Sequence, residues 1–169
     1  DGGGFFFTGN NHEELIVRGK DLFDNATPSG NSVAAEVLLK LARLCGDEKY
    51  ERFAVAVLRL VAPQIRRYPN GFGRALSALE FYLTPTREIV VIGEKGNNLE
   101  REVWRDYLPQ KVVALSSDEE TAAAAADFIP LLQGRKMIDG RATAYVCENF
   151  TCQKPVTTAA ELRRQLEIQ

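Results

Sequence analysis

The hydrophobic pattern of this 169-residue chain changes near residue 86. Before that point, apolar residues recur at the i, i+3, i+4 and i+7 spacing of helices that pack along one side. After it, short β-branched runs alternate with helical segments, as in proteins with buried parallel strands. The change predicts a mixed α/β fold with two domains, residues 1–85 and residues 86–169.

The first domain is predicted to contain three helices. The first spans about residues 28–45 and stops at Gly46, because glycine readily ends a helix. Asp47 is expected to cap the second helix, which Pro63 should kink or end. Asn70 is expected to cap the third helix.

The second domain is predicted to be a β-α-β-α-β-α unit. Three short apolar runs predict its strands, at residues 88–93, 111–115 and 143–147. Strands in this order pair in parallel through right-handed crossovers, so we expect a small three-stranded, mainly parallel sheet. Pro130 should disturb the alanine-rich helix predicted over residues 121–132. Thr158 and Glu161 have the spacing of a capping box at the start of the last helix.

A polar loop, residues 21–33, precedes the first predicted helix. Pro28 suits the first helical position, and Thr27 is placed to cap the helix. A cap needs one side-chain oxygen, but the loop supplies six polar side chains: Asp24, Asn25, Thr27, Ser29, Asn31 and Ser32. The surplus predicts a binding site; the alternative is an over-capped helix start in a polar loop. Upstream, residues 5–7 and 15–17 have the composition of two short hairpin strands.

Composition and charge exclude several classes of partner. The formal net charge of −2 gives no electrostatic reason to bind nucleic acid or an anionic membrane. No apolar run approaches the ~20 residues that span a bilayer, and no signal peptide is visible, so we expect a cytoplasmic protein. The chain opens at Asp1 on a run of glycine and phenylalanine, which favours a part cut from a longer polypeptide.

The three cysteines are too few for a disulfide scaffold. A zinc site would need all three to converge with His12, the one histidine of the sequence. Cys147 and Cys152 lack the spacing of a thioredoxin motif. A disulfide across a tight turn and two reduced thiols are both open, and we expect reduced, metal-free thiols in a reducing compartment.

A glycine-containing turn follows the first predicted strand. Gly93 and Gly96 stand where a helix begins, and helix N-termini attract anions. The turn matches neither a dinucleotide-binding fingerprint nor a Walker loop, and Glu94 adds a negative charge to it. A plain strand-to-helix turn is therefore favoured over an anion site.

Several motifs occur together in one order along the chain. They are GGFFFTGNNHEELIVRGKDLFDNATPSGNSVAAEVLLKLA, then YPNGFG, then REIVVIG, and last DGRATAYVC with FTCQ. This set resembles the C-terminal part of the thioredoxin-domain-containing family that includes spermatogenesis-associated protein 20 and bacterial relatives. The resemblance covers essentially the whole chain.

The resemblance implies a much larger parent protein. A thioredoxin-like domain would lie outside these 169 residues. So would most of an (α/α)6 barrel similar to those of N-acylglucosamine 2-epimerase and cellobiose 2-epimerase. The three predicted helices would be closing helices of that barrel, and the β-α repeat would be an appendage. Such barrels bind ligands in the mouth formed by loops at one end of the inner helices, so the polar loop would line a ligand site.

Within this resemblance, the polar residues have predicted roles. His12 and Asp24 are the candidate catalytic residues, and His12 suits a general acid or base because its ordinary pKa of about 6.5 lies near working pH. The candidate ligand-binding residues are Arg18, Lys20, Asn25, Ser29 and Asn31. The alternatives are a histidine in a surface turn, a solvated ion-pair cluster, and asparagines that only fasten the loop backbone. No metal and no cofactor are predicted.

Three functions fit these patterns. The first is part of a carbohydrate-active, epimerase- or isomerase-like enzyme whose barrel binds a sugar or similar hydroxyl-rich molecule, with the isolated chain inactive. The second is a noncatalytic scaffold, and the third is a small anion-binding α/β module. The expected partners are the remainder of the parent polypeptide or a second copy of the chain, in contact through exposed helix faces.

Overall fold

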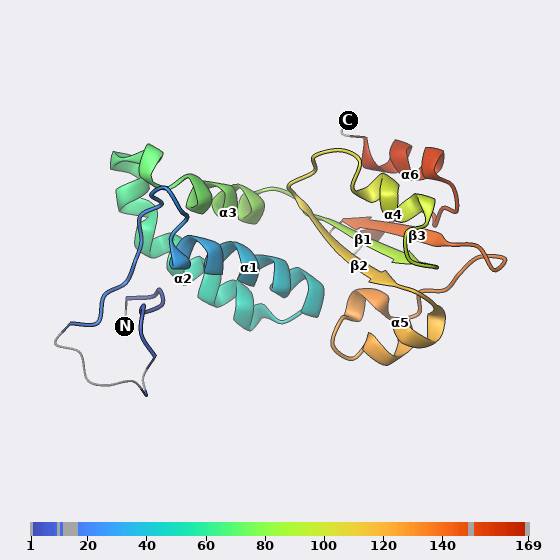
Figure 1. Ribbon diagram of the computed structural model, residues 1–169, viewed down its shortest axis with the longest axis horizontal. Coiled ribbons are helices and arrows are strands. Elements are labelled where there is room, and N and C mark those ends of the chain that lie inside the picture. Colours follow the sequence, from blue (N-terminus) through green and yellow to red (C-terminus); the bar gives the residue numbers. More distant parts are fainter. Residues whose placement is uncertain (1, 10, 12–16, 149–150, 168–169) are drawn as a thin grey trace. The chain divides into compact units, whose positions relative to one another are not determined.

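The structure of the chain, a computed structural model, describes residues 2–9, 11, 17–148 and 151–167. The chain divides into two compact units (Figure 1): a helical unit, residues 1–42 with 47–84, and a sheet unit, residues 43–46 with 85–169. The mixed α/β class is confirmed, because helices and a mixed sheet both occur. None of the described helices is long and apolar enough to cross a membrane.

The described part of the helical unit contains long helices joined by short connections. Its elements are α1 (Gly30–Cys45), α2 (Glu48–Arg67), the 3-10 turn η1 (Pro69–Gly71) and α3 (Gly73–Leu83). Apolar side chains on all three α-helices are buried, including Ala35, Leu39, Ala54, Val57, Val61, Ala75 and Phe81. The helical periodicity of the first half therefore reflects a packed core.

The start of α1 differs from the prediction. The helix begins at Gly30 rather than Pro28, and its cap is Ser29, whose Oγ accepts the backbone N–H of Ser32 at 3.1 Å. The shift follows from which side chain supplies the cap, because Ser29 and not Thr27 accepts the N–H of the first turn and is itself held by Asp24 Oδ1. At the other end, Gly46 takes a left-handed φ of 64° as the predicted stop signal.

The second and third helices agree with the prediction only in part. Asp47 caps α2 as predicted. Pro63 does not end α2, because Val61 lies buried against Phe72 and holds this part of the helix in the core. Asn70 does not cap α3; it lies in η1, and the N-terminus of α3 is capped from elsewhere in the sequence.

The predicted N-terminal hairpin is not seen in the described residues. Residues 5–7 form no strand, and residues 15–16 lie outside the described part of the chain. Phe7 N donates to Gly19 O at 2.9 Å, so the first segment contacts the chain two residues after the second predicted strand. A short Phe-rich run thus packs without entering a sheet.

The sheet unit contains the three predicted strands and a fourth short one. Its elements are β1 (Arg87–Ile92), α4 (Asn98–Val103), β2 (Lys111–Ser116), α5 (Glu119–Ala125), the 3-10 turn η2 (Pro130–Leu132), β3 (Thr143–Glu148), β4 (Thr151–Cys152) and α6 (Ala159–Leu166). The alanine-rich helix is shorter than predicted, and Pro130 begins a 3-10 turn after it. Thr158 caps α6 as predicted, since its hydroxyl accepts the N–H of Glu161. The Glu161 carboxylate accepts the Thr158 hydroxyl at 2.7 Å, where a full capping box would have it accept the Thr158 backbone N–H.

The strand directions correct the prediction of a mainly parallel three-stranded sheet. The strand order is β2-β1-β3-β4, and β1 pairs with β2 in parallel as expected, but β3 runs antiparallel to β1. The cause is a chain reversal at Asp139 and Gly140, both of which have positive φ. Two such residues form the turn typical of hairpins. The reversal lets β3 start beside the end of β1, where Thr143 pairs with Ile92.

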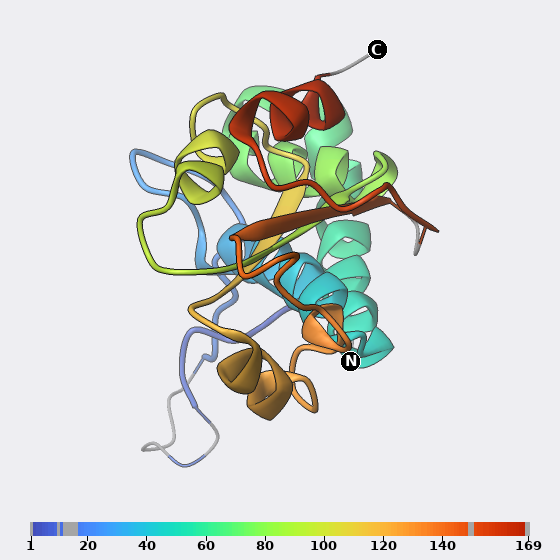
Figure 2. The same cartoon turned by 90° about the vertical axis from the view of Figure 1, so that its right-hand side faces the viewer.

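Helices cover both faces of this sheet (Figure 2). One face packs against α4 and α6 through Ile89, Val91, Leu99, Val103, Ala144, Val146, Leu162 and Leu166. The other packs against α5 and η2 through Val90, Ile92, Ala114, Ala122, Leu132 and Tyr145. Because β1 is buried on both faces, its sequence is a continuous apolar run after Glu88 rather than an alternating one.

The turn after β1 requires a glycine at one of its two glycine positions. Gly93 has a φ of 151°, and a Cβ at that position would lie 2.9 Å from the Cα of Ala142. Gly96 also has a positive φ, 79°, but a Cβ there would have nothing within 4 Å. Close packing against Ala142, just before β3, therefore explains why position 93 is a glycine.

This contrast predicts unequal effects of two matched substitutions. Gly96→Ala is expected to lower the free energy of unfolding by about 1 kcal/mol, the cost of a left-handed backbone. Gly93→Ala is expected to cost about 3 kcal/mol or more, because the backbone of Ala142 cannot yield as a flexible side chain does. Urea denaturation of both variants measures the difference, and equal losses would contradict the packing argument.

Candidate functional site

Asp24 caps the starts of two helices. Its Oδ1 accepts the backbone N–H of Ser29 at 2.8 Å, directly before α1. Its Oδ2 accepts the N–H groups of Arg74 and Ala75 at 2.7 and 3.2 Å, in the first turn of α3. The backbone N–H of Asp24 also donates to Gly71 O at 2.8 Å. A negative charge at a helix N-terminus is favourable, so Asp24 supplies the cap that α3 lacks locally.

These contacts favour the ionised form of the Asp24 carboxyl. Partial burial alone would raise its pKa, but four hydrogen bonds hold the pKa below its ordinary value. In decreasing order, they come from the Ser29 N–H, the Ser32 hydroxyl, the Ala75 N–H and the Arg74 N–H. The Ser29 hydroxyl in turn donates to Ser32 Oγ at 2.9 Å. A carboxylate with a depressed pKa is a poor general acid.

Asn31 holds the N-terminal segment against α1. Its Oδ1 accepts the N–H of Phe5 at 2.6 Å, and its Nδ2 donates to Phe5 O at 3.0 Å and to Asp21 O at 2.7 Å. Asn31 is buried, so these backbone contacts use both of its amide hydrogens. The arrangement matches the alternative in which the asparagine fastens the loop.

The charged groups of Arg18 and Lys20 both contact the ring of Phe6. Their charged groups lie 4.3 and 4.6 Å from the ring centroid of Phe6. Arg18 donates to Thr8 O at 2.7 Å, and Lys20 donates to Gly3 O. Both cations thus contact the N-terminal segment. His12, the candidate acid or base, lies outside the described residues.

Phe23 and Asn25 flank Asp24 and are exposed. The Phe23 ring is 45% exposed and packs on Phe72, with ring centroids 4.8 Å apart. A Cβ at Gly71 would come within 3.3 Å of that ring, so the glycine lets Phe23 lie against the backbone. Asp24 therefore fixes the loop, while Asn25 is exposed and Phe23 leaves part of its surface exposed.

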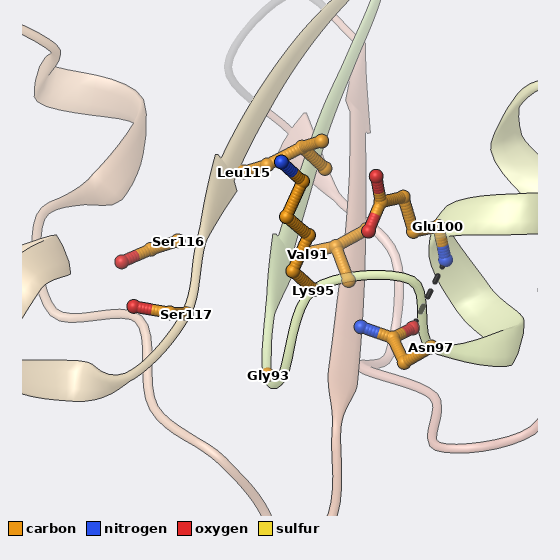
Figure 3. A pocket seen from close by; sticks show the side chains of 8 residues that line it. All are labelled: Val91, Gly93, Lys95, Asn97, Glu100, Leu115, Ser116 and Ser117. Carbon is orange, nitrogen blue, oxygen red and sulfur yellow. Dashed lines mark hydrogen bonds between the residues drawn. The ribbon is translucent and has the colours of Figure 1, made fainter.

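A second candidate site is a pocket of about 220 Å³ beyond the ends of β1 and β2 (Figure 3). Lys95, Asn97 and Glu100 line it on one side, and Ser116 and Ser117 point away from them in the view. The Glu100 carboxylate accepts the N–H of Gly96 at 2.6 Å. An internal carboxylate thus occupies the donor that a bound anion would need, which favours the plain turn over an anion site.

Cys147 and Cys152 form a disulfide between β3 and β4, where they are register partners. The prediction of two reduced thiols is therefore wrong. The two cysteines are only five residues apart, and the hairpin places them opposite each other. Within the described residues, no three His, Cys, Asp or Glu side chains gather in a way that would hold a metal ion.

Over most of its length, the chain is similar to mammalian spermatogenesis-associated protein 20. It is 33% identical to the human protein over 156 residues, which are 90% of this chain and 20% of the relative. It is 32% identical to the rat protein over 170 residues, 98% of this chain and 21% of the relative. The comparisons support this family. The chain spans about a fifth of the length of these relatives.

A more distant relative extends the similarity beyond mammals. An uncharacterized protein of Caenorhabditis elegans is 26% identical over 168 residues, 96% of this chain and 22% of the relative. No protein-family model matches the chain, and no solved structure gives a significant match. Similarity to spermatogenesis-associated protein 20 thus rests on sequence.

Two residues that the structure brings forward, Phe23 and Arg135, are not among the candidates that the sequence predicts. Phe23 carried a signal, since it is an aromatic residue inside a polar loop next to the candidate catalytic residue Asp24. Arg135 carried none, because its guanidinium meets the sulfurs of Cys147 and Cys152 only through the fold.

The double cap predicts a pH-dependent stability. Asp24→Ala is expected to lower the free energy of unfolding by about 2 kcal/mol at pH 7, because one cap contributes about 1 kcal/mol and this carboxylate serves two helix starts. The pKa of Asp24 is lowered from 3.8 on folding. Its contribution is therefore complete above the unfolded pKa and is lost as pH falls through the folded pKa.

Urea denaturation at neutral and acidic pH measures this effect. The matched control is Asp47→Ala, which removes a carboxylate that caps α2 alone and should cost about 1 kcal/mol. The difference between the wild type and Asp24→Ala should shrink as the pH falls below 3.8. A difference independent of pH would show that the charge of Asp24 plays no part.

Proposed function

We propose that the helical unit forms part of the wall of a sugar-binding (α/α)6 barrel, within a longer cytoplasmic protein of the spermatogenesis-associated protein 20 family. The chain matches only about a fifth of the length of its relatives, which supports the proposal that it is part of a larger protein. In this proposal α1, α2 and α3 are closing helices of the barrel, the sheet unit is an appendage, and a thioredoxin-like domain lies elsewhere. The 169-residue chain alone is inactive, because most of the cavity wall is missing from it.

The observation that carries the proposal is the exposed pair formed by Phe23 and Asn25. Ligand sites combine aromatic surface with a few polar groups that fix orientation. A ring face covers the C–H groups of a sugar, and a side-chain amide donates to and accepts from its hydroxyls. The Asp24 cap holds both residues in one place, which lowers the entropy cost of binding.

The remaining candidate residues divide their roles around this pair. Asp24, Ser29 and Asn31 support the loop through the hydrogen bonds that they make to the backbone. Arg18 and Lys20 present positive charge beside Phe6. His12 is the general acid or base of an epimerase- or isomerase-like reaction, since the ordinary pKa of histidine, about 6.5, lies near working pH.

Substitution of the exposed pair tests sugar binding. In the intact protein, Asn25→Ala and Phe23→Ala are expected to weaken binding of neutral mono- and disaccharides about tenfold or more, which corresponds to ~1.4 kcal/mol. The melting temperature of Asn25→Ala should stay within a few degrees, because its side chain is exposed. Isothermal titration calorimetry with a panel of such sugars measures the affinity.

The matched control is Asn98→Ala, which removes another exposed asparagine, from the sheet unit. It should leave sugar affinity unchanged. Equal affinities for Asn25→Ala and the wild type, or no sugar binding by the intact wild-type protein, would contradict the proposal.

A noncatalytic scaffold is the second candidate function, and exposed apolar helix residues favour it. Val37, Phe53, Leu76 and Leu83 are each at least one-third exposed on the helices of the helical unit. Exposed apolar surface of this kind favours protein contacts. The proposed partner is the remainder of the parent polypeptide or a second copy of the chain.

Self-association of the isolated chain tests this surface. Sedimentation velocity should show a concentration-dependent dimer, because the apolar residues lack their covering elements. Replacing Leu76 and Leu83 by Glu should shift the chain toward monomer. A wild-type monomer at all accessible concentrations would count against an interaction surface on these helices.

A further inference from the structure

We propose that Cys147 and Cys152 form a reversible dithiol–disulfide site that accepts electrons from an external dithiol reductant, with Arg135 stabilising the thiolate that is released. This inference concerns the sheet unit and is independent of the proposed sugar site. It rests on the position of the disulfide, the difference in exposure of its two cysteines, and the polar groups gathered on the same face of the sheet.

The disulfide lies at the edge of the sheet and joins segments that already pair. β4 is the last strand in the order β2-β1-β3-β4, and Glu148 pairs with Thr151 next to the two cysteines. Gln153 N also donates to Val146 O at 2.9 Å. A bridge that closes so short a loop restricts the unfolded chain less than a long-range bridge does. Structural stabilisation alone is therefore a weak reason for this bond.

The two sulfurs differ in accessibility, which sets the direction of exchange. Cys152 is exposed, whereas Cys147 is only 3% exposed. Exchange begins when a thiolate attacks an accessible sulfur. A reductant would therefore attack Cys152 Sγ, and Cys147 would leave as a buried thiolate.

Arg135 is positioned to stabilise that thiolate. Its Nη2 lies 3.4 Å from Cys147 Sγ and 3.1 Å from Cys152 Sγ. The guanidinium is held from two further directions, by the ring of Tyr145 at 4.7 Å and by a hydrogen bond from Nε to Leu131 O at 3.2 Å. A fixed cation beside a cysteine lowers the pKa of its thiol. A disulfide sulfur is only a weak acceptor, so this contact suits the reduced state better.

A buried carboxyl completes the cluster. Glu88 is the register partner of Cys147 on β1 and is 3% exposed. Burial raises its pKa, while the charges of Arg43 and Arg135 act in the opposite direction. Directly opposed residues of an antiparallel pair have neighbouring side chains. Glu88 is therefore placed to exchange a proton with the Cys147 sulfur.

The reaction balances with one dithiol per site. One thiolate of the reductant attacks Cys152 Sγ, forms a mixed disulfide and releases Cys147 as a thiolate. The second thiol of the reductant loses its proton and attacks the reductant's first sulfur, which is bonded to Cys152 Sγ in the mixed disulfide. This attack releases Cys152 as a thiolate. Two electrons pass to the site, the reductant becomes a disulfide, and its two thiol protons reach the two cysteine sulfurs through solvent or Glu88.

Reduction of the folded chain by dithiothreitol tests the proposal. Thiol labelling followed by mass spectrometry should show Cys147 and Cys152 reduced while circular dichroism retains the folded signal. Arg135→Gln should slow the reduction about tenfold, because the leaving thiolate loses its cation. Arg135→Lys, which keeps the charge, should recover part of the rate. In the reduced Arg135→Gln chain, ultraviolet absorbance of the thiolate should show a higher thiol pKa.

The matched control is Arg141→Gln, which removes an exposed arginine paired with Asp139. It should be reduced at the wild-type rate. The proposal is overturned if the disulfide resists a large excess of dithiothreitol, if reduction coincides with loss of the folded signal, or if Arg135→Gln reacts as fast as the wild type.

Discussion

The helical unit depends on one carboxylate, that of Asp24, which caps the starts of both α1 and α3. The start of α3 has no side-chain cap of its own, so its first N–H groups would otherwise have water as their partner. The same carboxylate fixes the loop in which Asn25 and part of Phe23 remain exposed. Asp24, which the sequence presents as a candidate site residue, therefore stabilises the loop, and the positions of the exposed Phe23 and Asn25 depend on it.

Both faces of the sheet carry an apolar core, but they carry different polar groups. The face that packs on α4 and α6 is apolar, and Glu102 and Arg163 lock those two helices together through hydrogen bonds of 2.7 and 2.9 Å. The opposite face carries Tyr145 and the disulfide, with Arg135 over both. Because β1 is buried on both faces, the polar groups of the two candidate sites lie away from its centre. They lie at the ends of β1 and β2, and at the edge of the sheet near β4.

Local signals predicted local structure well. Asp47 and Thr158 cap the helices they precede, and the three apolar runs form strands, since caps and periodicity depend on neighbours within a few residues. The β-α order predicts a parallel β3, but the strand is antiparallel because the chain reverses at Asp139 and Gly140, a pair typical of hairpins. The cap of α3 was missed because its carboxylate lies 50 residues away from Arg74 in the sequence.

The sequence by itself determined the mixed α/β class, the division of apolar patterns near residue 86, the helix caps at Asp47 and Thr158, and the similarity to spermatogenesis-associated protein 20. Only the tertiary structure decided which polar groups are already used. Asp24 and Asn31 are bound to backbone groups, Glu100 occupies the turn that a bound anion would need, and Arg135 meets two cysteines that follow it in the chain. The physical reason is that hydrogen-bond partners and charges act through space, over distances that depend on how remote segments pack.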